Sequence, residues 1–317
     1  MKEIKWVVNE MPKTEDFQLK IMALEQIEKA REFHESFPQY FRTPLVKLTH
    51  MASFLGVKEL YIKDESYRFG SNTFKILGES FSMANYTAKQ TNKDISELPY
   101  NALVSESLGK GSGQAAFISA IGPNNIKAVE LMGYEEFPAW VMQGYGTMAM
   151  EAAEQLWELG CEAPTHIFIQ AGAGSLAGAI TGYFLNHYLI NPPTVVVVES
   201  DTAAFLYKAA LACNEPDTIS WDILKNHVSV FAACPDCVAA KGMSMLSAPL
   251  EGDPQIISGE AGAVTMGLLA YIMQMNELKE LKDYLKLDSN SKILLFCTEG
   301  DTNPEFLKEI LWEGKAF

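Results

Sequence analysis

One segment in the middle of the chain restricts the fold more than any other. Residues 166–170 (HIFIQ) are mostly apolar, residues 171–174 (AGAG) are small, and an apolar stretch runs from Ser175 to Leu189. A strand, a glycine loop and a helix in this order are typical of α/β proteins, in which helices cover a mainly parallel sheet. The segment therefore predicts an α/β fold.

Other segments repeat this alternation along the chain. Strands are expected at residues 60–63, 194–198 and 293–297, a loop at 96–102, and helices at 24–37, 48–55, 76–81, 112–121, 140–159, 203–212 and 259–275, with another beginning at Pro304. Residues 194–198 are β-branched throughout, as in a strand that is covered on both faces. We therefore expect a mainly parallel sheet with helices on both faces.

The composition restricts the partners of the chain. Of its 317 residues, 48% are hydrophobic and 21% are charged, which suits one large or two modest globular domains. The formal net charge of −15 leaves no basic patch for phosphates, so neither nucleic acid nor an anionic membrane is expected as a partner. No apolar run is long enough to span a bilayer and the N-terminus has no signal-like apolar core, which predicts a cytoplasmic protein.

The cysteines and histidines indicate no metal site. The chain has five cysteines, an odd number that indicates reduced thiols. Cys234 and Cys237 form a Cys-x-x-Cys pair, but a metal site would need a second pair or nearby histidines, and the five histidines have no ligand-like spacing. A redox motif would need a thioredoxin-like strand and helix around the pair. A redox role for Cys234 and Cys237 is therefore an alternative.

A lysine stands at the junction between an expected strand and an expected helix. Residues 67–75 (YRFGSNTFK) follow the strand at 60–63 and an acidic turn at 64–66. Burial among apolar neighbours favours the neutral form of an amine, which is the nucleophile in Schiff-base chemistry. Lys75 is therefore a candidate for covalent attachment of a carbonyl group. The alternative for an isolated lysine is a charge that snorkels off the face of a helix.

Together with other motifs, this segment resembles a known family of enzymes. The motifs are RTPL at 42–45, KDESYRFG at 63–70, WVMQGY at 140–145, QAGAG at 170–174, ISGEAGAV at 257–264, TEGDT at 298–302 and WEG at 312–314. They are similar to those of the pyridoxal-phosphate enzymes of the tryptophan-synthase-β type (fold type II), and within them to the diaminopropionate ammonia-lyases. The similarity covers both ends and most of the middle of the chain.

The resemblance implies how the chain is divided. Residues 1–75 would form the N-terminal part of a large domain that includes the lysine segment, residues 76–145 a smaller α/β domain, and residues 146–317 the remainder of the large, cofactor-binding domain. The small domain is truncated, because only residues 123–138 stand where the family has several dozen residues. The family also implies a homodimer.

The resemblance further implies pyridoxal 5′-phosphate as the cofactor and assigns residues to it. Lys75 would attach the cofactor and then act as an acid and base, Asn72 would contact the ring's 3-hydroxyl, and Thr298 would face the ring nitrogen. Thr298 could equally be part of a plain turn at the end of a strand. Glu260 would lie near the cofactor, although an acid at a helix start is also a partner for the helix dipole.

The glycine loop would hold the phosphate of the cofactor. Its implied contact residues are Gly172, Ala173, Gly174, Ser175 and Leu176. Small residues let backbone N–H groups approach a phosphate, and the N-terminal end of the following helix favours an anion. A glycine loop after a strand is also a device for packing a helix on a sheet, and its order in the chain between Lys75 and Thr298 favours the phosphate.

The chain departs from the family where the catalytic acids belong. The family's loop for the substrate carboxylate corresponds to residues 105–115, where Ser107 replaces an aspartate, and Ala128 falls near the place of a second acid. A serine cannot act as a carboxylate base. Ser107, Lys110 and Gly111 are candidates for binding the substrate, with Lys110 equally a solvated loop charge.

Two hypotheses for the function follow. The first is a pyridoxal-phosphate-dependent ammonia-lyase that performs β-elimination on a small amino acid such as 2,3-diaminopropionate, giving pyruvate and ammonia, with Lys75 as the base. The second is a pseudoenzyme or regulatory partner subunit that keeps the cofactor but has lost the catalytic acids. Release of ammonia by a cofactor-bound protein distinguishes them.

Overall fold

The structure is a computed structural model, and it describes residues 3–14, 18–104, 136–211, 219–300 and 304–315. Within these residues seven strands form one sheet: β1 (Lys5–Val8), β2 (Leu45–Lys47), β3 (Glu59–Asp64), β4 (His166–Gln170), β5 (Thr194–Ser200), β6 (Val230–Cys234) and β7 (Lys292–Cys297). Their order across the sheet is β1-β6-β5-β4-β7-β3-β2. The strands from β6 to β3 are parallel to one another, and the edge strands β1 and β2 pair antiparallel.

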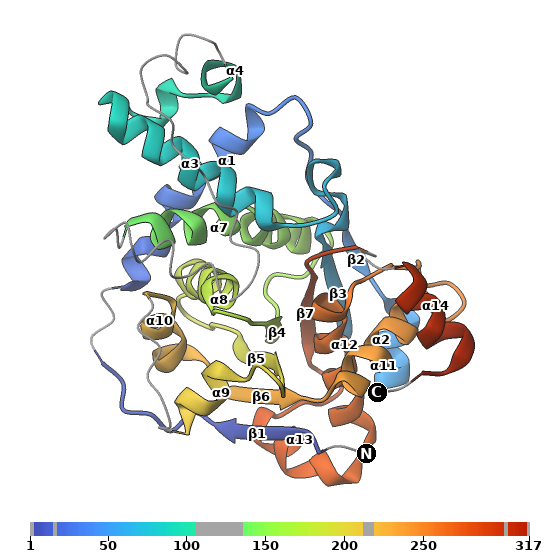
Figure 1. Cartoon of the computed structure of the whole chain (residues 1–317). Coiled ribbons are helices and arrows are strands. Elements are labelled where there is room, and N and C mark those ends of the chain that lie inside the picture. Colours follow the sequence, from blue (N-terminus) through green and yellow to red (C-terminus); the bar gives the residue numbers. More distant parts are fainter. Residues whose placement is uncertain (1–2, 15–17, 105–135, 212–218, 301–303, 316–317) are drawn as a thin grey trace.

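Helices cover both faces of this sheet (Figure 1). The α-helices are α1 (Leu24–Glu35), α2 (Thr49–Leu55), α3 (Lys75–Thr91), α4 (Tyr100–Leu103), α7 (Glu136–Glu158), α8 (Ser175–His187), α9 (Phe205–Ala210), α10 (Ile219–His227), α11 (Asp236–Ser247), α12 (Glu260–Gln274), α13 (Lys279–Leu285) and α14 (Pro304–Glu313). Short 3₁₀ helices are η1 (Gln18–Met22), η2 (Glu65–Gly70), η3 (Ile95–Glu97) and η4 (Asn276–Leu278). In Figure 1, α7, α8 and α10 lie on one side of the sheet, and α2, α11, α12 and α14 lie on the other.

The buried strands explain why two layers of helices are needed. Along β7, Ile293 and Leu295 pack in the core beneath α12, while Leu294 and Phe296 pack in the core beneath α7 and α8. Successive side chains of a strand point to opposite faces, so a strand that is apolar throughout must be covered twice. The predicted α/β fold with a mainly parallel sheet is confirmed.

A smaller apolar cluster lies apart from the two main cores. It consists of Ala30 and Phe33 of α1 and of Phe81 and Ala84 of α3. The helix α3 begins at Lys75 and ends before Asn92, which adopts a left-handed conformation with φ of 53°. This cluster therefore packs the lysine-bearing helix against the N-terminal part of the chain.

The observed elements differ from the predicted ones in a few places. The expected loop at 96–102 contains η3 and α4, because the Asp94 carboxylate accepts from the Ser96 amide (3.0 Å) and the Glu97 carboxylate accepts from the Asp94 amide (2.9 Å). This capping box and the following proline were signals in the sequence. The predicted helix at 203–212 begins only at Phe205, and the predicted helix at 112–121 lies outside the described residues.

No helix among the described ranges is long and apolar enough to cross a membrane.

Candidate active site

The carboxyl ends of β3, β4 and β7 meet at one edge of the sheet. The strand β7 lies between β3 and β4 and is parallel to both. The chain continues from β4 to β5 on one side of β4 and returns later to place β7 on its other side. A reversal of this kind leaves a crevice outside the carboxyl ends of the strands, where α/β proteins bind ligands.

The segment that carries Lys75 is fastened to the residues that follow β7. The Phe74 amide donates to the Thr298 carbonyl (3.0 Å), and the Gly300 amide donates to the Asn72 carbonyl (3.0 Å). Between these bonds, Thr73 and Glu299 form an isolated antiparallel bridge. Residues far apart in the sequence, Asn72 to Lys75 and Thr298 to Gly300, therefore lie side by side.

The start of α12 joins the same cluster of segments. The Gly259 amide donates to the Glu299 carbonyl (3.0 Å). A Cβ atom on Gly262 would lie 3.1 Å from the Thr298 amide nitrogen and 2.6 Å from the Ser258 hydroxyl, so only glycine allows this approach. Glu260 is the first residue of α12 and is exposed. Partial burial and the charges of Asp236 and Glu299 raise the pKa of its carboxyl group.

The side chain of Lys75 is half-buried, and within the described part of the chain its ammonium group makes no hydrogen bond or ion pair. Asn72 is exposed and has a left-handed backbone with φ of 58°. The preceding turn is also left-handed at Phe69 (φ 49°) and Gly70 (φ 69°). A non-glycine residue with positive φ is uncommon and is retained where the surrounding structure fixes it.

A buried group of charged side chains holds this turn in place. We call Lys63, Glu65, Arg68 and Glu151 the buried charged cluster, and each side chain is at most 1% exposed. Arg68 donates to both oxygens of Glu65 (2.8 Å each) and of Glu151 (2.9 and 2.7 Å). Lys63 donates to Glu151 (2.7 Å). Burial opposes the charge on Glu151, but Lys63 and Arg68 outweigh it and lower its pKa to about 2.

Lys63, Glu65 and Arg68 belong to the KDESYRFG motif at 63–70, but the motif does not predict a network of ion pairs among them. The signal was present as charged residues that directly follow an apolar strand. Their partner Glu151 lies on α7, and nothing in the sequence connects it to the strand. Because two cations face two anions, the cluster is neutral overall, as a buried group of charges has to be.

The glycine loop follows β4 at the same edge. The Ala171 amide donates to the Val198 carbonyl of β5 (2.9 Å), and Gly174 has a φ of 102°. Gly172 and Ala173 are exposed, while Ser175 and Leu176 are half-buried in the first turn of α8. The first N–H groups of a helix have no partner within the helix, so this turn offers donors to an anion.

Gln170, the last residue of β4, connects this loop to Thr298. Its Nε2 atom donates to the Phe296 carbonyl (3.1 Å) and to the Thr298 hydroxyl (2.7 Å). Its Oε1 atom is buried and has no hydrogen-bond partner among the described residues. Gln170 is part of the QAGAG motif at 170–174, but the motif predicts no role for it. A polar residue that ends a wholly buried strand was the available signal.

These observations fit pyridoxal 5′-phosphate. A free lysine amine, a glycine loop at a helix start, a buried threonine hydroxyl and an unpaired buried oxygen of Gln170 converge on one edge. A pyridoxal-phosphate site requires an amine, donors for the phosphate and a partner for the ring nitrogen. The predicted residues Asn72, Lys75, Glu260 and Thr298 and the loop from Gly172 to Leu176 are thus brought together. Ser107, Lys110 and Gly111 lie outside the described residues.

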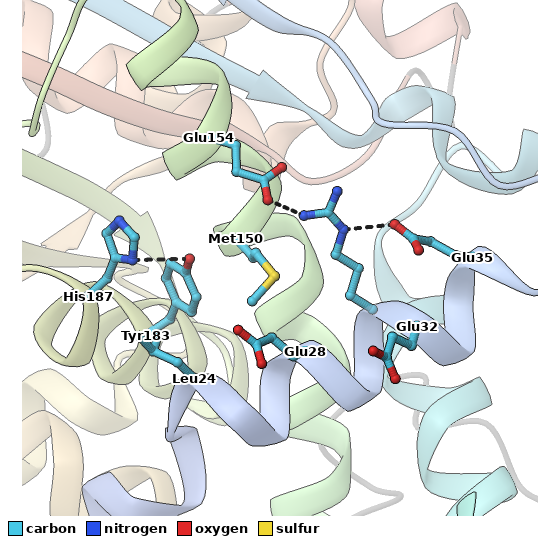
Figure 2. A pocket seen from close by; sticks show the side chains of 9 residues that line it. Leu24, Glu28, Glu32, Glu35, Met150, Glu154, Tyr183 and His187 are labelled. Atoms are coloured by element: carbon cyan, nitrogen blue, oxygen red, sulfur yellow. Dashed lines mark hydrogen bonds and ion pairs between the residues drawn. The ribbon is translucent and has the colours of Figure 1, made fainter. Parts of the chain in front are cut away.

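A separate hollow of ≈ 420 Å³ lies between α1, α7 and α8. Figure 2 shows the carboxylates of Glu28, Glu32, Glu35 and Glu154 around it. Arg31 is bound to Glu35 (3.0 Å) and to Glu154. The excess of negative charge disfavours a phosphate. The hollow also borders Tyr183 and His187, in the last turns of α8, whereas the glycine loop lies before its first turn.

The Cys-x-x-Cys pair has the wrong environment for a reactive thiolate. Cys234 ends β6 and Cys237 lies in the first turn of α11, so a strand and a helix do flank the pair. Both thiols are free and buried, and burial raises the pKa of the Cys234 thiol far above its usual value. Reactive cysteines have lowered pKa values and partial exposure. In the ranges that the structure describes, no group of three potential ligands could hold a metal ion.

Comparison of the sequence with known proteins agrees with this geometry. The family described as "Pyridoxal-phosphate dependent enzyme" matches residues 127–287. A diaminopropionate ammonia-lyase of Salmonella typhimurium is 34% identical over 368 residues, which cover 90% of this chain and 91% of the relative. This alignment is longer than the chain of 317 residues, so the relative contains residues that have no counterpart here.

Solved structures give the same result. The selenomethionine-containing holo diaminopropionate ammonia-lyase of Escherichia coli superposes with a TM-score of 0.87 at 30% identity, covering 99% of this chain and 98% of that one. The same enzyme in complex with an aminoacrylate-PLP azomethine reaction intermediate superposes with a TM-score of 0.85 at 31% identity, with the same coverage.

Proposed function

The chain belongs to the diaminopropionate ammonia-lyases, a family of pyridoxal-phosphate-dependent enzymes, and from this we propose that it converts 2,3-diaminopropionate and water into pyruvate and two molecules of ammonia. The observation that carries the proposal is the fastening of the Lys75 segment to the residues after β7, through the Phe74–Thr298 and Gly300–Asn72 backbone bonds. These bonds hold the segment that carries Lys75, the candidate Schiff-base lysine, at the carboxyl edge of the sheet. The glycine loop after β4 lies at the same edge.

We assign the residues of this edge to parts of the cofactor. When bound, the pyridoxal group supplies an aldehyde for the substrate amine and a sink for electrons at the substrate Cα. Lys75 would hold the aldehyde, the loop from Gly172 to Leu176 the phosphate, Asn72 the 3-hydroxyl and Thr298 the ring nitrogen. Glu260 would border the cofactor at the start of α12.

Lys75 would also move the proton. With the cofactor and the substrate bound, the Lys75 amine would be available to accept the Cα proton and to return a proton to the departing β-amino group. By the family resemblance, Ser107 and Ala128 fall where the family has its two acids. Loss of a general base costs typically about 10²–10⁴-fold in rate, so we expect a slower enzyme than its relatives.

We propose the same domain division as the family resemblance implies, with residues 76–145 as a shortened small domain. Its apolar contacts with the N-terminal part of the chain include the small cluster of Ala30, Phe33, Phe81 and Ala84 and the ring contact of Phe37 with Tyr100. A partner subunit would supply further cover for a small domain, which favours a homodimer. We also propose a cytoplasmic location, a small amino acid as the substrate, and neither nucleic acid nor a membrane as a partner.

The replacement of both acids also favours a second candidate function. A protein that keeps the cofactor site but cannot abstract the Cα proton would act as a binding or regulatory subunit. A binding subunit would share every contact described for Asn72, Lys75 and Thr298. The two functions therefore have the same site geometry and differ in activity.

One experiment tests the proposal. We expect the purified protein to show the near-visible absorbance of lysine-bound pyridoxal phosphate, and to release pyruvate and ammonia from D- or L-2,3-diaminopropionate. Lys75→Ala should abolish both, whereas Lys89→Ala, on the exposed part of the same helix in an ion pair with Glu136, should change neither. Absorbance that shifts with the substrate but gives no product would favour the binding subunit. Absence of absorbance after addition of the cofactor would overturn both functions.

A further inference from the structure

We propose that Gln170 is a positioning residue, which holds the Thr298 hydroxyl as a hydrogen-bond donor directed at an unprotonated ring nitrogen of the cofactor. This inference rests on the proposed function, because it requires pyridoxal phosphate at the carboxyl edge of the sheet. The inference adds Gln170 to the residues assigned to the site. Gln170 ends β4, and its side chain contacts the end of β7 and the turn that follows β7.

The first step is the orientation of the Gln170 amide. A backbone carbonyl can only accept a hydrogen bond, so the atom that lies 3.1 Å from the Phe296 oxygen must be the amide nitrogen. The same nitrogen lies 2.7 Å from the Thr298 Oγ1 atom. Both amide hydrogens are therefore donated, one to each strand-end group, and Gln170 is the donor in its bond with Thr298.

The second step is the direction of the Thr298 hydroxyl proton. A hydroxyl has one proton, and because Gln170 already occupies one of its lone pairs, that proton has to point away from Gln170. Thr298 is only 2% exposed, and its hydroxyl donates to no acceptor among the described residues. A buried donor without a partner costs about 1–3 kcal/mol. The described residues therefore supply no acceptor for the Thr298 hydroxyl proton.

The third step is the chemistry of that acceptor. A neutral pyridine nitrogen has one lone pair and accepts a hydrogen bond, whereas a protonated one is itself a donor and would face the hydroxyl proton. A protonated ring nitrogen could donate to the second lone pair of Thr298 but would leave the hydroxyl proton without an acceptor, so the Gln170 bond favours the neutral ring. This weakens the electron sink of the cofactor and suits elimination more than transamination.

The buried Oε1 atom of Gln170 supports the inference. Gln170 is 6% exposed, and its unpaired oxygen is a cost to the folded chain. A methionine of similar shape would fill the space without that cost. The retention of an amide with both hydrogens donated and its oxygen unpaired indicates a role for the donors.

A double-mutant cycle tests the proposal on the intact protein. Gln170→Met removes the donors at nearly constant shape, and Thr298→Val removes the hydroxyl. We expect each to raise the dissociation constant of pyridoxal phosphate by about tenfold, the effect of one hydrogen bond. We expect both to shift the absorbance maximum of the bound cofactor in the same direction. The double variant should bind the cofactor within about twofold of Thr298→Val, because Gln170 acts through Thr298.

A matched control removes the same kind of bond elsewhere. Asn186, near the end of α8, donates its side-chain amide to the Leu19 (3.1 Å) and Met22 (2.8 Å) carbonyls. Asn186→Leu removes a half-buried side-chain amide away from the carboxyl edge of the sheet, so it should leave the dissociation constant of the cofactor and the absorbance maximum unchanged.

Gln170→Glu provides a second variant of opposite character. A carboxylate accepts the Thr298 proton and so turns the hydroxyl away from the ring nitrogen, and we expect weaker cofactor binding than in Gln170→Met. If the buried charge prevents this variant from folding, the methionine cycle alone decides.

The outcomes separate the two proposals. A wild-type protein that binds the cofactor, together with a Gln170→Met variant whose affinity and spectrum match the wild type, would overturn the role of Gln170 alone. Additive losses in the double variant would also overturn it. A wild-type protein that does not bind the cofactor would overturn the proposed function itself.

Discussion

Lys63 and Lys75 lie on one continuous segment, β3–η2–α3, in opposite surroundings. Lys63 is fully buried, and its ammonium group donates to Glu151 (2.7 Å), to Gln155 (2.8 Å) and to the Thr43 carbonyl (2.7 Å). Lys75 is half-buried, and its ammonium group has no partner in the described ranges. Burial alone would favour Lys63 as the Schiff-base lysine.

The difference distinguishes two regions of the molecule. The buried charged cluster supports the site, and we call it the frame. The carboxyl edge of the sheet, which carries Lys75, is the site. In the buried charged cluster every charged group is paired, because an unpaired buried charge costs several kcal/mol. At the carboxyl edge, Lys75, the Thr298 hydroxyl and the first turn of α8 keep hydrogen-bonding capacity that no described residue uses. Unused capacity at one edge, supported by a fully paired interior, is the arrangement expected of a ligand site.

The largest expected effect concerns the frame. Glu151→Gln removes one of two negative charges that face Lys63 and Arg68, so we expect the free energy of unfolding to fall by about 3–5 kcal/mol. Chemical denaturation of the cofactor-free protein measures it. The control is Glu154→Gln, one turn further along α7, whose ion pairs with Arg31 and Arg42 are partly exposed and contribute at most about 1 kcal/mol. Equal losses in the two variants would remove the distinction between frame and surface.

The next effect concerns the packing of the lysine helix on the frame. Gly144 of α7 lies so close to α3 that a Cβ atom would be 2.4 Å from the Leu77 carbonyl oxygen. Gly144→Ala should therefore push α3 away and lower the free energy of unfolding by about 1–3 kcal/mol. Since Lys75 begins α3, cofactor affinity should fall as well, as titration of the cofactor-free protein would reveal. An alanine variant with unchanged stability and affinity would show that the helices move apart freely.

A pH-dependent change of about 2 kcal/mol in the free energy of unfolding is expected from His34, which bonds to both α3 and α7. Its Nε2 atom donates to the Leu77 carbonyl (3.0 Å), and its Nδ1 atom accepts from the Thr147 hydroxyl (2.8 Å). Burial lowers the pKa of His34 to about 3.

Because this pKa lies below the value of 6.5 in the unfolded chain, the unfolded state binds the proton first as the pH falls. His34 therefore costs the protein about 2 kcal/mol of stability between pH 8 and pH 5. His34→Gln keeps a donor and an acceptor but does not titrate, so its unfolding free energy should depend less on pH over this range. Parallel pH profiles for the variant and the wild type would contradict the assignment.

The smallest effect on stability is expected at the site itself. A Cβ atom on Gly172 would meet nothing within 4 Å, and its φ is not in the left-handed region. Gly172→Ala should change the free energy of unfolding of the cofactor-free protein by less than about 0.5 kcal/mol. It should still weaken cofactor binding, because the methyl group occupies space that the phosphate needs. Unchanged affinity would mean that the loop serves only to pack α8.

The local sequence determined much of the fold and the list of candidate residues. The strand at 166–170 was predicted with the bounds that β4 has, and α8 begins at Ser175 as expected, because apolar runs and glycine loops act through neighbouring residues. The motifs also identified Lys75, Asn72, Glu260, Thr298 and the glycine loop, and with them the family.

Only the tertiary structure decided which of these groups are paired. Whether Lys63 or Lys75 is neutralised depends on Glu151, which reaches β3 from a helix far along the chain. The bond between Gln170 and Thr298 likewise exists because β4 and β7, which are far apart in the sequence, are neighbours in the sheet. The pairing of polar groups depends on distances of a few tenths of an ångström between remote segments. Sequence patterns report periodicity and local propensity, and these do not contain such distances.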